Sequence, residues 1–143
     1  MRLLLTGGAG FIGRHVLNEL LARRHDVRVM DSLRPDVHRD PIGWTPPAGV
    51  EFLAADMRDR DTLDRAVAGR DAVIHLAAKV GLGVDVSDLP DYASSNDTGT
   101  AELLAAMARA NVRRLTLASS MVVYGEGLGH CVEHGAEIGR AHV

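Results

Sequence analysis

The chain has 143 residues, of which 46% are hydrophobic, and this is enough for one domain with a single core. Its formal net charge of −3, with acidic and basic residues mixed along the chain, argues against a nucleic-acid-binding surface. No apolar run approaches the roughly 18 residues that span a membrane, and the first residues do not have the pattern of a secretory signal. The single cysteine, Cys131, excludes an internal disulfide and suits a reducing, cytoplasmic environment.

A glycine-rich segment near the start of the chain is the first functional signal. The apolar run Leu3–Leu5 predicts a buried strand, and apolar side chains recur at helical spacing over residues 11–21. Between and within them lie four glycines: Gly7, Gly8, Gly10 and Gly13. Glycine allows positive φ and a close approach of a ligand, and the N-terminus of the following helix attracts anions. The segment therefore predicts a strand, a turn and a helix that bind a pyrophosphate, with a purely structural loop as the alternative.

An acidic residue follows the second predicted strand, residues 27–30. Asp31 lies 18 residues beyond Gly13, about where a dinucleotide-binding fold places the acid that accepts hydrogen bonds from ribose hydroxyls. An acid at this position favours NAD over NADP, because a 2′-phosphate would meet a like charge. Arg34 softens this preference without reversing it. The alternative is a local turn or cap made by Asp31 and Ser32.

The rest of the chain alternates strand and helix patterns. The first helix is expected to end near residues 25–26, and the prolines of residues 33–49 predict a connection. Gly69 and Asn111 are expected to end two later helices, the second in a left-handed conformation. Those helices are predicted at residues 58–68 and 91–110, and further strands at residues 50–54, 72–76 and 115–118.

Five strands alternating with helices predict an α/β fold: a Rossmann-type, doubly wound parallel sheet with helices on both faces. Right-handed crossovers give the strand order 3-2-1-4-5. A ligand then binds at the carboxyl edge, at the switch between the first and fourth strands. The segments expected at that edge are Gly7–Gly13, Asp31, Asp56, Leu76–Ala78 and Ser119–Ser120. Their convergence supports a dinucleotide site more strongly than any one of them.

With these segments assembled, the chain resembles an extended short-chain dehydrogenase/reductase of the NAD-dependent epimerase/dehydratase family. The matching segments are TGGAGFIG at 6–13, Asp31, ADMRD at 55–59, HLAA at 75–78, NDTGT at 96–100 and SSMVVYG at 119–125. The resemblance implies an NAD-binding Rossmann domain over residues 1–125, incomplete relative to the family and hence truncated. Residues 126–143 would be a loop or tail that leads into a catalytic and substrate-binding part.

The resemblance also assigns roles to residues. Phe11 and Ile12 would offer backbone N–H groups to the pyrophosphate, and Asp56 would accept a hydrogen bond from the adenine amino group. Leu76–Ala78 would pass beneath the nicotinamide half. Asn96 would face the site from a helix, with an ordinary polar helix position as the alternative. The implied cofactor-binding residues are Gly7, Gly10, Phe11, Ile12, Gly13, Asp31, Asp56, Met57, Leu76, Ala77, Ala78, Asn96 and Ser119.

The catalytic residues of the family are matched only in part. Ser120 lies four residues before Tyr124, as the family's catalytic serine precedes the tyrosine of its VYG segment, and would hydrogen-bond a substrate hydroxyl or carbonyl. The family's chemistry also needs a tyrosine base with a lysine four residues later, whose charge lowers the pKa of the tyrosine. Neither Tyr92 nor Tyr124 is followed by such a lysine, and Lys79 is the only lysine. We therefore expect no turnover by this chain alone.

The implied function is the NAD-binding part of an enzyme that acts on a nucleotide sugar through hydride transfer to and from nicotinamide. The alternatives are a non-catalytic dinucleotide-binding module, a truncated inactive fragment, and an atypical reductase with another base. No nucleic-acid or membrane partner is expected, and a homodimer is the assembly to expect by resemblance. Lys79 is either a solvated surface residue or a ligand near the nicotinamide ribose. The pattern H-C-x-x-H at residues 130–134 allows a zinc site, although a loop without metal is the favoured interpretation.

Overall fold

The protein is built around a five-stranded parallel sheet with the order β3-β2-β1-β4-β5, which is the order predicted from the sequence. The strands are β1 (Arg2–Thr6), β2 (Asp26–Asp31), β3 (Glu51–Ala54), β4 (Ala72–His75) and β5 (Leu115–Leu117). The computed structural model describes residues 1–35, 37–38, 44–81, 85–120, 123, 128–132 and 135–138.

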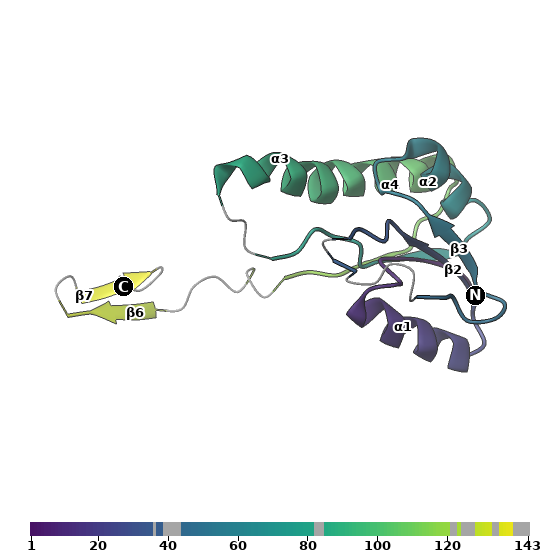
Figure 1. The fold of residues 1–143 in the computed structure, drawn as a ribbon, viewed down its shortest axis with the longest axis horizontal. Coiled ribbons are helices and arrows are strands. Elements are labelled where there is room, and N and C mark those ends of the chain that lie inside the picture. The colour runs from purple at the N-terminus through teal and green to yellow at the C-terminus, as the bar shows by residue number, and fades with distance from the viewer. Residues whose placement is uncertain are drawn as a thin grey trace.

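Helices cover both faces of the sheet (Figure 1). On one face lies α1 (Phe11–Ala22), and on the other lie α2 (Arg60–Val67) and α4 (Gly99–Arg109). The short helices η1 (Val86–Asp88) and α3 (Leu89–Tyr92) and the π-helical turn η2 (Ala93–Thr98) lead into α4. None of the helices in the described ranges is long and apolar enough to cross a membrane.

The two faces of β1 supply the two halves of the core. Successive residues of a strand point to opposite faces, so Leu4 and Leu5 pack on different helices. Leu4 belongs to the cluster formed with α2 and α4, and Leu5 packs with Leu17 of α1; all three side chains are fully or almost fully buried. Trp44, in the connection after β2, packs edge-on against Phe52 with 4.8 Å between the ring centres.

Residues with positive φ lie at the C-terminal ends of α1, α2 and α4. The first helix ends at Ala22, earlier than predicted, because Arg24 adopts a left-handed conformation with φ of 59°. The N–H of Arg24 then donates to the carbonyl of Leu21, and the N–H of His25 donates to that of Leu20, the pattern of a Schellman cap. The stops predicted for the later helices also take positive φ: Gly69 has φ of 71° and Asn111 has φ of 56°.

Two segments differ from the sequence-based expectation. Residues 91–110 do not form one regular helix, because η2 inserts a π-helical turn between α3 and α4. Residues 126–143, predicted as a loop or tail, contain an antiparallel hairpin of β6 (Leu128–Cys131) and β7 (Gly135–Ile138), with Gly135 at φ of 80°. Glycines interrupt the alternation by which a strand is predicted here. Two of the histidines considered for zinc, at positions 134 and 142, lie outside the described residues.

The packing of α1 on the glycine turn leads to a first prediction. A Cβ at Gly13 would contact the carbonyl oxygen of Gly7 and lie 2.7 Å from the Cα of Gly8. We expect Gly13→Ala to lower the free energy of unfolding by about 1–3 kcal/mol, because backbone atoms must shift to admit the methyl group. Urea denaturation measures the change. The control is Glu19→Ala on the exposed side of the same helix, and equal midpoints for the two variants would contradict the prediction.

Candidate functional site

A pocket of about 1120 Å³ lies at the carboxyl edge of the sheet. Its volume exceeds the range of about 300–1,000 Å³ typical of drug-sized ligands. It brings together segments from the ends of β1, β2, β3, β4 and β5, as expected for the switch point of a doubly wound sheet. The predicted residues that line it are Gly7, Gly10, Phe11, Ile12, Gly13, Asp31, Met57, Leu76, Ala77, Ala78 and Ser119.

The glycine turn forms the floor of the pocket beside β4. Gly7 has φ of 70°, and its N–H donates to the carbonyl of Met30 at 2.8 Å. A Cβ at Gly7 would lie 2.7 Å from the backbone nitrogen of Ala77, so only glycine permits this approach. Helix α1 starts above this turn without a side-chain cap from Gly10 and without an acidic residue in its first turn. Its free N–H groups and positive dipole end suit an anionic ligand.

Asp31 presents a buried carboxylate to the same pocket. Only 8% of the residue is exposed, and its Oδ2 accepts a hydrogen bond from the N–H of Ala9 at 3.0 Å. Its Oδ1 accepts from the N–H of Leu33 at 3.0 Å, so the local turn considered as an alternative is present as well. The Nε2 atom of His38 lies 3.2 Å from Oδ1. A carboxylate has about four acceptor sites, so the three nitrogen partners leave room for a hydroxyl donor.

A buried hydrogen-bond chain lies beneath the floor of the pocket, and the sequence analysis missed it. The Oγ1 of Thr6 accepts from the N–H groups of Leu76 at 3.2 Å and Ala77 at 3.3 Å. Its own hydroxyl therefore donates to the Nδ1 of His75 at 2.6 Å. With Nδ1 as acceptor, neutral His75 carries its proton on Nε2 and donates it to the Oγ1 of Thr100 at 3.1 Å. Burial lowers the pKa of His75, which favours this neutral form.

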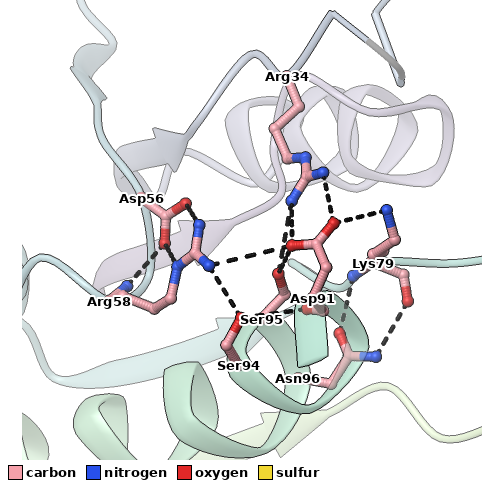
Figure 2. Close-up of polar contacts among 8 residues, drawn as sticks. All are labelled: Arg34, Asp56, Arg58, Lys79, Asp91, Ser94, Ser95 and Asn96. Carbon is pink, nitrogen blue, oxygen red and sulfur yellow. Dashed lines mark hydrogen bonds and ion pairs between the residues drawn. The ribbon is translucent and has the colours of Figure 1, made fainter. Parts of the chain in front are cut away.

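A cluster of charged and polar side chains, called the rim cluster here, includes Arg34, which lines the pocket. Figure 2 shows the polar contacts within this cluster. Its members are Arg34, Asp56, Arg58, Lys79, Asp91, Ser94, Ser95 and Asn96. Asp56 faces a second, smaller pocket of about 50 Å³ and not the large one. Both of its carboxylate oxygens accept hydrogen bonds from Arg58 at 2.7 Å, and these bonds lower the pKa of Asp56. Asp56 therefore lies at the small pocket, and its carboxylate is already paired with the guanidinium of Arg58.

Two other predicted residues lie outside the lining of the large pocket. The side chain of Asn96, on η2, bonds the main chain of Lys79: its Oδ1 accepts from the Lys79 N–H at 2.7 Å and its Nδ2 donates to the Lys79 carbonyl at 3.0 Å. Asn96 thus holds the segment that follows β4. Ser120 does not line the pocket, and its carbonyl accepts from the N–H of Val123 at 3.2 Å. Tyr124 lies outside the described residues.

Lys79 has a defined partner and is not a solvated surface residue. Its Nζ lies 2.7 Å from the Oδ2 of Asp91 and 5.2 Å from the ring centre of Tyr92, and 17% of the side chain is exposed. Asp91 also binds Arg34, and the hydrogen bonds from Arg34 and then Lys79 lower the pKa of the Asp91 carboxyl. In the ranges that the structure describes, histidines, cysteines and acids form no group suited to a metal ion.

The strand order, the glycine turn and the pocket at the strand switch define a Rossmann-type α/β domain. The model of the NAD dependent epimerase/dehydratase family matches residues 3–137, and the chain belongs to this family.

Known proteins similar to the chain include several nucleotide-sugar epimerases. The bifunctional UDP-glucose 4-epimerase and UDP-xylose 4-epimerase 1 of Pisum sativum is 33% identical over 133 residues, covering 87% of this chain and 38% of the relative. A UDP-glucose 4-epimerase sequence of Klebsiella pneumoniae is 35% identical, and the match covers 88% of this chain and 94% of that sequence. The structure of Thermus thermophilus UDP-glucose 4-epimerase in complex with NAD has a TM-score of 0.77 at 38% identity, covering 89% of this chain and 40% of that one. The chain thus spans about 38% of the length of the Pisum sativum relative.

The buried histidine leads to a prediction about pH. The lowered pKa of His75 means that the unfolded chain binds a proton more readily than the folded one. We therefore expect the free energy of unfolding to be highest above the ordinary pKa of 6.5 and to fall as the pH drops below it. Urea denaturation at pH 7.5 and pH 5.5 measures this loss, since carboxylates with lowered pKa titrate at lower pH.

The control variant for this pH dependence is His75→Asn, whose side chain does not titrate. It is expected to be less stable than the wild type at pH 7.5 and to lose less stability between the two pH values. Equal losses in the two proteins would contradict a neutral, buried His75.

Proposed function

We propose that the chain binds NAD in the large pocket and forms the cofactor-binding part of an epimerase or dehydratase that acts on a nucleotide sugar. The observation that carries the proposal is the convergence of the glycine turn, the buried Asp31 carboxylate and the end of β4 on one pocket. The family and the NAD complex of the Thermus thermophilus relative support the same cofactor. An acid at the ribose position favours NAD over NADP.

The residues present fit this cofactor. The first N–H groups of α1, at Phe11 and Ile12, would bind the pyrophosphate above Gly7, Gly10 and Gly13, where added Cβ atoms would meet backbone. Asp31 would accept hydrogen bonds from the ribose hydroxyls. Met57 and Asp56 would meet the adenine, and Leu76–Ala78, held from below by Thr6, would lie beneath the nicotinamide half. Bound NAD supplies the hydride acceptor and donor of the reaction.

The residues that act on the substrate in this family are matched only in part by this chain. Ser120 would hydrogen-bond a substrate hydroxyl or carbonyl, with Ser119 at the cofactor. The sequence lacks the tyrosine and lysine pair of the family, so we propose that binding of NAD occurs without turnover by residues 1–143 alone. This same feature favours a non-catalytic dinucleotide-binding module as the second candidate function. The domain limits of 1–125 and 126–143, a cytoplasmic location and a homodimer stay predictions.

Calorimetric titration with NAD⁺ tests the cofactor. We expect the wild-type chain to bind in the micromolar range and Asp31→Ala to weaken binding about tenfold to a hundredfold, because hydrogen bonds from the ribose to a buried carboxylate are lost. Asp64→Ala is the control, since Asp64 pairs with Arg109 on the exposed side of α2 and α4. A wild-type chain that is folded but does not bind NAD⁺, or equal affinities of all three proteins, would contradict the proposal.

A further inference from the structure

The carboxylate of Asp91 joins cations from three separate connections (Figure 2). The most distant is Arg58, after β3, whose Nη1 lies 4.0 Å from Oδ1. Arg34, in the connection after β2, donates from Nη1 to Oδ1 at 3.0 Å and from Nη2 to Oδ2 at 2.8 Å. Lys79, after β4, lies with its Nζ 2.7 Å from Oδ2. The hydroxyl of Ser95 donates to Oδ1 at 3.3 Å. The pair with Arg34 is bidentate, the geometry in which a guanidinium is bound most firmly and in one orientation.

The position of Arg34 relates this pair to the large pocket. Arg34 follows Asp31 by three residues and lines both the large pocket and the small one. An arginine beside the ribose-binding acid is the residue type that accommodates a 2′-phosphate in dinucleotide-binding folds. In this protein the two terminal nitrogens of Arg34 instead face Asp91 on α3. Both side chains are half-buried, which limits screening of the pair by solvent.

We propose that Asp91 is a specificity-determining residue for the cofactor: it holds the Arg34 guanidinium against α3 and thereby withholds a positive charge from a phosphate on the adenosine ribose. The preference for NAD over NADP then has two sources. Asp31 repels the 2′-phosphate, and Asp91 keeps Arg34 from attracting it. This inference rests on the proposed binding of NAD, and it adds a residue that is distant in sequence from the glycine turn and from the ribose-binding acid.

The test compares the affinities of the full chain for NAD⁺ and NADP⁺ by calorimetry. Asp91→Asn has nearly the same shape as the wild type but removes the negative charge that binds Arg34. We expect the affinity for NADP⁺ relative to NAD⁺ to rise about tenfold, the effect of one charge-assisted hydrogen bond to phosphate. Release of Lys79 and a more positive pocket act on the pyrophosphate that both ligands share, and this effect cancels in the ratio. A more positive pocket also attracts the 2′-phosphate itself, so further variants must assign a rise in the ratio to Arg34.

Matched variants separate the effect of Arg34 from that of Lys79, the other cation in close contact with Asp91. Adding Arg34→Met to Asp91→Asn is expected to return the ratio to its wild-type value, whereas adding Lys79→Met leaves it raised. Asp64→Asn removes an equal charge from an exposed pair with Arg109 and leaves the ratio unchanged. A ratio that stays at the wild-type value in a folded Asp91→Asn protein, or a rise that persists after Arg34→Met, would overturn the inference.

A further variant keeps the test independent of the folding of the Asp91 variants. If Asp91 keeps Arg34 away from the 2′-phosphate, then Arg34→Met alone leaves the ratio of NADP⁺ affinity to NAD⁺ affinity as it is in the wild type. A tenfold loss of relative NADP⁺ affinity in this variant would show that Arg34 already reaches the phosphate and would refute the inference. Failure of the proposed function is distinct, because the folded wild-type chain would then bind neither dinucleotide, and the inference would fall with it.

Discussion

Gly7 and the end of β4 approach each other so closely that no side chain fits between them. A Cβ on Gly7 would lie 2.7 Å from the nitrogen of Ala77 and 2.8 Å from the carbonyl carbon of Leu76. Thr6, the residue before this turn, binds the N–H groups of the same two residues through its hydroxyl. The turn and the end of β4 are therefore fixed together, and the pocket above them reaches down to main-chain atoms. Both the shape of the pocket and its suitability for a phosphate group follow from this contact.

The polar groups around the pocket fall into two layers with different electrostatics. In the hydrogen-bond chain from Thr100 through His75 to Thr6, His75 and Thr6 are buried and Thr100 is partly buried. The chain is neutral, which is the form that burial favours. The rim cluster carries formal charges, but Arg34 and Asp91 are half-buried and paired, so each charge keeps partial hydration and a direct partner. The neutral layer positions the floor of the pocket. In the NAD complex that we propose, the charged layer determines which charges lie near the adenosine end of the ligand.

Periodicity and chirality explain why the fold could be predicted. Buried strands and amphipathic helices leave local patterns, and right-handed crossovers then fix the order β3-β2-β1-β4-β5. The spacing from the glycine turn to Asp31 is likewise local, and both line the pocket. The pair of Arg34 with Asp91 joins residues 57 positions apart and leaves no local pattern. No local pattern predicts the contact of Asn96 either: its amide hydrogen-bonds the main chain of Lys79, and the residue does not line the large pocket.

The candidate pocket and the family's proton-transfer residues draw on different parts of the sequence. The residues that line the pocket all lie between Gly7 and Ser119, on α1, at the strand ends and in the connections that follow the strands. The family's tyrosine and lysine pair has no match at either tyrosine of this chain. Because the pocket needs neither of these residues, the binding of NAD that we propose and the proposed preference over NADP do not depend on catalysis. If the proposed binding of NAD holds, substitutions at Asp31 and Asp91 report on binding itself, free of any effect on a chemical step, and His75→Asn reports on stability.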